Sequence, residues 1–281
     1  MSHSYQPTQD TEWKSLEYNK AEWQYVTLGG GKELILLFPG GMRRPVYGGN
    51  FVKELAKDYR IIIPVYPRIS KLKAIVEGIT AIMTNENFEN THIYGSSFGG
   101  LVAQAFMYYK PEKVKNIIIS NTGTVNDDKD FLKRIKRLLI LLRIVPAFIV
   151  RRIMLRSFIK LIPHESEEYD EIVAKLRYII EFKILDKQDI ICHFESLIDF
   201  QENIHLTPDK IHQLETRMLI ITSENDPGIS PTAFKSLKKL YVHAKFYHFA
   251  EGGHMPLLIR ENEFTRLVKD QLLQENNKSL G

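Results

Sequence analysis

Cysteine is almost absent from the sequence. Cys192 is the single cysteine in 281 residues, so the chain can form no internal disulfide bond. One thiol is also too few for a cysteine-rich metal site. The lack of disulfide bonds is typical of a protein from a reducing compartment, so we expect a cytoplasmic protein.

Long hydrophobic runs and excess charge are lacking too. The longest apolar stretch, Leu138–Val150, is interrupted by Arg143 and Pro146 and is too short to span a bilayer. The N-terminal segment has no basic region followed by an apolar run, so we expect no secretory signal. The net charge is only +4, and no zinc-finger or RNP-like motif is present, which argues against a nucleic-acid partner.

Short apolar runs alternate with helical patterns along most of the chain. The runs are β-branched and apolar on both faces, as strands covered by helices on both sides must be. They are Glu33–Phe38, Tyr59–Tyr66, Thr91–Gly95, Val114–Ser120, Arg217–Thr222 and Lys245–Ala250, and the helical patterns are Asn50–Lys57, Ser70–Met83, Phe98–Tyr109, Thr232–Tyr241 and Glu261–Leu273. This alternation predicts an α/β protein with a doubly wound, mostly parallel sheet. The weaker pattern Trp23–Gly29 predicts an additional antiparallel edge strand.

The alternation stops once, between residues 124 and 216. This segment has helical patterns and no clear strand, so we predict a helical cap inserted into an α/β core of residues 1–123 and 217–281. Within it, the stretch Phe131–Pro163 holds many basic residues and no acidic one. The basic residues are Lys133, Arg134, Lys136, Arg137, Arg143, Arg151, Arg152, Arg156 and Lys160.

A Gly-x-Ser-x-Gly motif lies between a predicted strand and a predicted helix. Gly95, Ser97 and Gly99 fill this motif, whereas centring it on Ser96 would require a glycine at Tyr94. In this context the serine sits in a strained turn that raises its hydroxyl above the sheet. We therefore predict Ser97 as the nucleophile, and an ordinary turn of small residues is the alternative.

A nucleophilic serine needs a base and a group that orients the base. In this type of fold the chain order is Ser, then Asp or Glu, then His. His254 follows the last predicted strand in a loop opened by two glycines, and Asp226 follows the strand before it. We predict His254 as the base and Asp226 as its partner, with Glu224 as the alternative acid. The position after Val114–Ser120, where an acid could also stand, reads Asn121 and holds none.

The negative oxygen of an acyl-transfer intermediate needs two backbone N–H donors. Phe98, which follows the serine, supplies one of them. The second is expected from the loop after the first predicted parallel strand, where Gly41 is the first choice and Met42 the second. Chemistry of this kind requires no metal and no organic cofactor.

These motifs, in this order, resemble the α/β-hydrolase fold superfamily over about Glu22 to Leu273. The resemblance rests on Leu37–Gly41, Gly95–Gly100, Ser223–Pro231 and Glu251–Phe264. The chain has Pro39-Gly40 where the superfamily commonly has His-Gly. Three segments also look like the maspardin-like proteins: Tyr59–Pro67, Val145–Phe158 and Leu240–Glu263. That resemblance implies a binding or trafficking protein without a complete triad, yet this sequence carries His254 where that group lacks a histidine.

Two functions are therefore kept open. The first is a serine hydrolase that cleaves an ester, thioester or lactone with an apolar acyl part. The second is a non-catalytic binding protein on the same fold, since fold alone does not determine function. The uninterrupted Ser–Asp–His order favours the enzyme.

The basic stretch of the predicted cap also has two interpretations. The apolar residues Leu138, Leu139, Leu141, Leu142, Val145, Phe148, Ile149 and Ile153 are expected to pack over the sheet and roof an acyl-sized pocket, with the arginines in water. The alternative is that the basic cap contacts an anionic membrane peripherally. The first interpretation predicts weak vesicle binding that does not depend on lipid charge.

Overall fold

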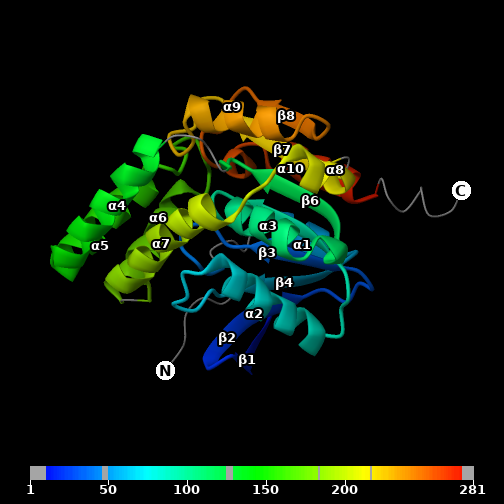
Figure 1. The fold of residues 1–281 in the computed structure, drawn as a ribbon, viewed down its shortest axis with the longest axis horizontal. Helices are drawn as coiled ribbons and strands as arrows, with labels where there is room; N and C mark the ends of the chain where they lie inside the picture. The colour runs from blue at the N-terminus through cyan, green and yellow to red at the C-terminus, as the bar shows by residue number, and fades with distance from the viewer. Residues whose placement is uncertain (1–10, 46–49, 125–128, 183, 216, 274–281) are drawn as a thin grey trace, which may run out of the picture.

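A single eight-stranded sheet forms the centre of the protein (Figure 1). The computed structural model describes residues 11–45, 50–124, 129–182, 184–215 and 217–273. The strands are β1 (Glu12–Tyr18), β2 (Ala21–Leu28), β3 (Leu34–Phe38), β4 (Arg60–Pro64), β5 (Thr91–Ser96), β6 (Val114–Ser120), β7 (Met218–Ser223) and β8 (Lys245–Phe249). Their order in the sheet is β1-β2-β4-β3-β5-β6-β7-β8. All neighbours from β4 to β8 pair in parallel, whereas β1, β2 and β4 pair antiparallel.

Helices cover both faces of this sheet, as the apolar strands require. One face carries α2 (Leu72–Asn85), α3 (Phe98–Tyr109), α8 (Pro208–Glu215) and α9 (Pro231–Leu240). The other face carries α1 (Asn50–Ala56) and α10 (Glu261–Leu273). β3 and the middle strands are buried on both faces, which confirms the prediction of a doubly wound, mostly parallel sheet.

The antiparallel end of the sheet differs from the prediction in one respect. Trp23–Gly29 does form an antiparallel strand, β2, but β1 lies outside it and is the true edge. The burial pattern of β1 explains why it was missed. Its sequence Glu-Trp-Lys-Ser-Leu-Glu-Tyr is largely exposed, so it has none of the apolar pattern that marks the other strands.

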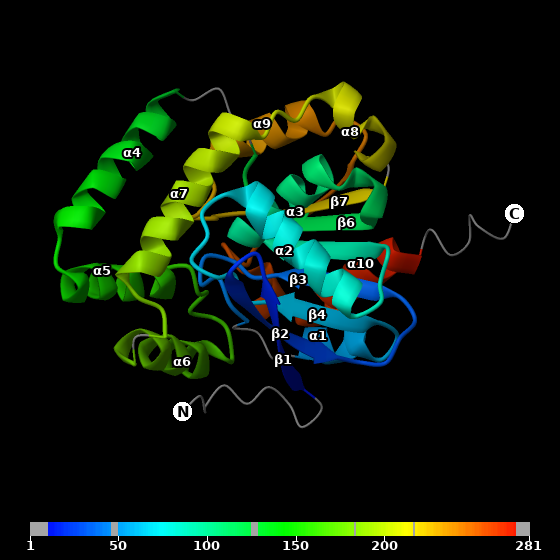
Figure 2. The same ribbon diagram turned by 60° about the horizontal axis from the view of Figure 1, so that its bottom comes forward.

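Five helices lie between β6 and β7 in the described part of the chain, where the cap is predicted. They are α4 (Lys129–Ile144), α5 (Ala147–Ile159), α6 (Tyr169–Glu181), α7 (Lys187–Asn203) and α8. α7 lies between α4 and the α/β core, while α4 and α5 lie on the outer side (Figures 1 and 2). No described helix is long and apolar enough to cross a membrane.

The apolar residues of α4 and α5 do not all pack as expected. Leu139 is buried and Leu138, Leu142 and Val145 are half-buried. In contrast, the side chains of Leu141, Phe148, Ile149 and Ile153 are exposed, so the expectation that they pack over the sheet is wrong. Apolar residues at helical spacing show that a helix has an apolar face. They do not show which face is covered when, as in α4 and α5, both the inner and the outer face carry apolar residues.

Candidate active site

Ser97 occupies a tight turn between β5 and α3. Its backbone has φ 55° and ψ −121°, a conformation that costs a non-glycine residue free energy. Two glycines make the turn sterically feasible. A Cβ on Gly95 would lie 2.2 Å from the carbonyl oxygen of Gly99, and a Cβ on Gly99 would lie 2.1 Å from that of Phe38. The local sequence thus folds as the Gly-x-Ser-x-Gly motif predicts, with Ser97 at its apex.

Neighbouring strands hold this turn in place. The Ser97 amide donates to the carbonyl oxygen of Ser120 at 2.9 Å, and Thr122 Oγ1 donates to the carbonyl oxygen of Ser97 at 2.7 Å. The strained residue is therefore fixed from the end of β6. Such fixing is needed, because an unsupported residue would relax out of this conformation.

His254 and Asp226 form a hydrogen-bonded pair across two loops. The distance from His254 Nδ1 to Asp226 Oδ1 is 2.7 Å, and both side chains are at least nine-tenths buried. The Gly228 amide donates to the same Asp226 oxygen at 2.7 Å. Glu224, the alternative acid, instead pairs with His248 at 3.2 Å, and its side chain is 61% exposed. Asp226 is thus the carboxylate that meets His254.

Asn121 is a further member of this arrangement that the sequence did not reveal. Its Nδ2 donates to Asp226 Oδ2 at 2.9 Å and lies 3.1 Å from the carbonyl oxygen of Gly253, next to His254. It also lies 2.7 Å from Ser223 Oγ. Asn121 has φ 45°, which asparagine tolerates better than most residues. One side chain at the end of β6 therefore ties the aspartate loop to the histidine loop.

Ser97 and His254 line the same cavity. It has a volume of about 550 Å³ and is also bordered by Gly40, Gly41 and Met42. In the described residues no hydrogen bond joins Ser97 Oγ to His254, so only the His–Asp half of the predicted triad is closed. Catalytic hydrogen bonds are often longer before substrate binds.

The loop after β3 forms one wall of this cavity. The Arg43 amide donates to the carbonyl oxygen of Gly40 at 2.9 Å, which closes a turn around Gly41 and Met42. Phe98 is the first residue of α3, where backbone N–H groups have no partner within the helix. Gly41, Met42 and Phe98 thus remain the predicted donors to a negative oxygen.

Arg43 is a buried cation behind this loop, and no sequence pattern singles it out. It is only 2% exposed, and burial lowers its pKa. Its Nη2 donates to the carbonyl oxygens of Pro67 at 2.9 Å and Ile69 at 2.7 Å. The guanidinium carbon lies 5.7 Å from the ring centroids of both Tyr66 and Phe98. No carboxylate forms an ion pair with it among the described residues.

His193 lies on α7, so the helical insertion between β6 and β7 also contributes to the site. Its ring centroid lies 4.6 Å from that of Phe98, and it lines the cavity. Burial, with a smaller contribution from Arg43, lowers its pKa to about 3. His193 is therefore a neutral group at neutral pH, and its hydrogen-bonding capacity rather than its charge is available to a ligand.

The outer part of the cavity is acidic. Among its lining residues, five glutamates stand against one lysine: Glu165, Glu167, Glu168, Glu171, Glu261 and Lys175. The inner part is apolar, with Phe158, Ile162 and Leu176 from the helical insertion. Such a cavity suits a neutral or cationic molecule with an apolar portion better than an anion.

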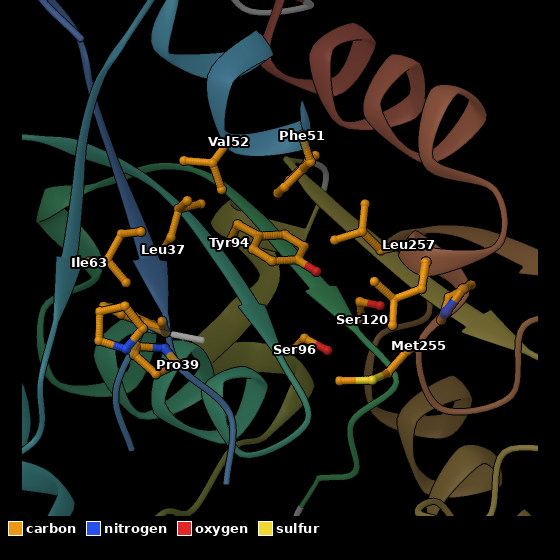
Figure 3. A pocket seen from close by; sticks show the side chains of 14 residues that line it. Leu37, Pro39, Phe51, Val52, Ile63, Tyr94, Ser96, Ser120, Met255 and Leu257 are labelled. Atoms are coloured by element: carbon orange, nitrogen blue, oxygen red, sulfur yellow. The ribbon is translucent and has the colours of Figure 1, made fainter. Parts of the chain in front are cut away.

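A smaller apolar cavity adjoins the large one. It has a volume of about 40 Å³ and shares Ser96, Met255 and Leu257 with the larger cavity. In Figure 3 the hydroxyl groups of Ser96 and Ser120 lie on the side of Met255, below Tyr94. Ser96, the neighbour of Ser97, thus faces this apolar space.

Comparisons with known proteins give sequence relatives, most of them maspardins, and solved structures of similar fold. No family model matches the chain. Maspardin from Danio rerio is 24% identical over 220 residues, covering 77% of this chain and 66% of that protein. Maspardin from Homo sapiens is 24% identical over 245 residues, covering 86% of this chain and 75% of that protein. The chain thus spans about two thirds to three quarters of these relatives.

Solved structures match almost the whole chain. A thermophilic esterase from Thermogutta terrifontis has a TM-score of 0.72 at 17% identity, covering 94% of this chain and 98% of that one. The enol-lactonase from Burkholderia xenovorans LB400 has a TM-score of 0.71 at 16% identity, covering 92% and 99%. The sheet order and these likenesses show that the chain has the α/β-hydrolase fold, and its sequence is similar to the maspardins.

Proposed function

We propose that the protein is a serine hydrolase that cleaves an ester, thioester or lactone with an apolar acyl part. One observation carries the proposal: His254, which is hydrogen-bonded to Asp226, borders the same cavity as the strained Ser97. A strained serine and a buried, oriented imidazole in one cavity are what acyl transfer needs. The similar structures that are an esterase and an enol-lactonase support this class of reaction.

In this mechanism, Ser97 Oγ attacks the substrate carbonyl carbon and His254 Nε2 accepts the serine proton. Asp226 holds the Nδ1–H side of the ring and stabilises the imidazolium that forms. The backbone N–H groups of Phe98 and of Gly41 or Met42 bind the oxyanion. His254 then protonates the leaving group, and water attacks the acyl-serine with His254 again as the base, which regenerates Ser97.

The helical insertion acts in this proposal as a cap, residues 124–216, which selects the substrate. Phe158, Ile162 and Leu176 offer an apolar surface to the acyl part, and the small cavity beside Ser96 extends it. The glutamates at the outer part disfavour substrates with a free carboxylate. The expected substrate is therefore a neutral or cationic small molecule.

A second function, a non-catalytic binding protein in the cytoplasm, keeps support from two observations. Five of the six similar proteins in the sequence comparison are maspardins, and no hydrogen bond joins Ser97 Oγ to His254 in the part of the chain that the structure describes. This function would use the same cavity for a ligand that is not converted.

An active-site label separates the two functions. A fluorophosphonate should modify the wild-type protein at Ser97, as peptide mapping would reveal. Ser97→Ala should abolish labelling and the turnover of short-chain esters while the protein stays folded. Ser96→Ala is the matched control and should retain both. Absence of labelling in the folded wild-type protein would favour the binding function, and labelling that is lost only in Ser96→Ala would refute the assignment of the nucleophile.

A further inference from the structure

Exposed apolar side chains are concentrated where α4 meets α5. Six large apolar residues there are between 38% and 75% exposed: Ile140, Leu141, Ile144, Phe148, Ile149 and Ile153. We call them the α4–α5 apolar patch. They make up six of the eleven exposed large apolar residues in the described chain, within a stretch of fourteen positions. Such concentration marks an interaction surface rather than the usual scatter of single exposed residues.

The patch cannot be buried by a simple rotation of the helices. The opposite faces of α4 and α5 are already packed, with Leu139, Val150 and Met154 buried. α4 is also tied to α7 by Lys136 with Glu202 at 2.6 Å and by Arg143 with Glu195 at 2.8 Å. The outer apolar face is therefore a fixed feature of the folded protein.

Cations surround the patch. Arg152 and Arg156 alternate with Phe148, Ile149 and Ile153 on the exposed side of α5. Among the described residues, no acidic side chain forms an ion pair with Arg137, Arg151, Arg152, Arg156 or Lys160. The surface thus offers apolar side chains and uncompensated positive charge together.

The combination of exposed apolar side chains and positive charge indicates which kind of partner fits the surface. In a symmetric dimer the same patch would face itself and bring these arginines together, which opposes association. A bilayer with anionic lipids supplies both complements, because its acyl boundary accepts the apolar side chains and its phosphates attract the cations. We propose that the α4–α5 apolar patch docks the protein on an anionic lipid surface, with Ile144 and Phe148 entering the headgroup region. The docking does not depend on whether Ser97 is a nucleophile.

Cosedimentation with vesicles tests the proposal. The wild-type protein should bind vesicles of phosphatidylcholine and phosphatidylserine, bind pure phosphatidylcholine vesicles much less, and lose binding as salt is added. Ile144→Ser with Phe148→Ser should weaken binding at every salt concentration. Arg152→Glu with Arg156→Glu should weaken the partition coefficient at low salt by at least about tenfold, since each cation near such a surface contributes on the order of 1 kcal/mol.

Lys235→Glu with Lys239→Glu is the matched control, because it makes the same charge change at exposed positions of α9. This pair should bind vesicles within about twofold of the wild type, since the charges lie outside the docking surface. Three results would overturn the proposal. The first is that the wild type binds both vesicle types equally or binds neither. The second is that the α9 control loses as much vesicle binding as Arg152→Glu with Arg156→Glu. The third is that the wild type forms a dimer in solution, which Ile144→Ser with Phe148→Ser dissociates. The last result would assign the patch to a contact between two copies.

Discussion

Gly228 gives the sharpest test of the His254–Asp226 pair. A Cβ at this position would lie 2.6 Å from both Cε1 and Nδ1 of His254, and 3.2 Å from Asp226 Oδ1. Ordinary contacts of a Cβ begin at 3.4 Å, so Gly228→Ala must move the imidazole and the loop apart by about 0.8 Å. The glycine is exposed and does not have a left-handed backbone, so the loop itself should accept alanine.

The expected result is a loss of activity without a loss of stability. A displacement near 1 Å in a catalytic group costs about a hundredfold in rate. This corresponds to about 2.7 kcal/mol in the activation free energy. The value of kcat/KM for a short-chain 4-nitrophenyl ester should therefore fall by about that factor, and Tm should stay close to that of the wild type. The downfield NMR signal of the His254 Nδ1 proton should shift or vanish, which provides a readout independent of turnover.

Gly123→Ala is the matched control for this experiment. Gly123 lies two residues from Asn121, but the atom nearest to its added Cβ is the Cβ of Ala233 at 3.6 Å, an ordinary contact. This variant should retain both activity and the NMR signal. Wild-type activity and an unchanged imidazole proton in Gly228→Ala would refute the reasoning that this glycine makes room for the pair.

Three further predictions concern support, pH and substrate charge. Asn121→Ala should lower kcat/KM by about tenfold or more and lower the unfolding free energy in urea by about 1–2 kcal/mol. Asn121→Gly should lose the same activity with less backbone strain. Equal stability of the wild type and both variants would contradict a role of Asn121 in joining the two loops. The low pKa of His193, about 3 against an unfolded value of 6.5, means that the unfolded chain takes up a proton first as pH falls. This residue should therefore lower the unfolding free energy by about 2 kcal/mol between pH 7 and pH 5, and His193→Phe should remove that part of the pH dependence in urea titrations. A neutral 4-nitrophenyl ester should be cleaved faster than its analogue with a terminal carboxylate, and added salt should reduce this difference in rate. Faster cleavage of the anionic ester would contradict the role of the glutamates.

The parts of the fold that follow from local pattern could be predicted from the sequence. α3 and α10 begin and end at the residues predicted for them, because their apolar periodicity is strong and their ends are marked by a motif or a loop. β1 could not be predicted, because an exposed edge strand has no apolar face to reveal it. The outer apolar face of α5 was assigned to the interior for a related reason: periodicity does not tell which of two apolar faces is covered.

The candidate site also has residues that the sequence predicts and residues that it does not. Ser97, Asp226 and His254 lie in motifs whose order along the chain is informative, and the structure brings Asp226 and His254 to 2.7 Å. Asn121 and Arg43 act through contacts between loops that are distant in sequence, so no local pattern identifies them. The one available signal was that asparagine follows β6 where an acid could stand, together with its tolerance of left-handed backbone.

Arg43 has a consequence for the loop that borders the cavity. Its guanidinium has lost its hydration and is held by the carbonyl oxygens of Pro67 and Ile69, while its own backbone closes the turn around Gly41 and Met42. Moving this loop would drag a positive charge through an apolar interior, which is costly. The orientation of the Gly41 and Met42 amides is therefore set during folding, and in the proposed mechanism little reorganisation remains when negative charge develops beside them. Burying this cation lowers the stability of the protein, and the same cation makes the loop harder to move.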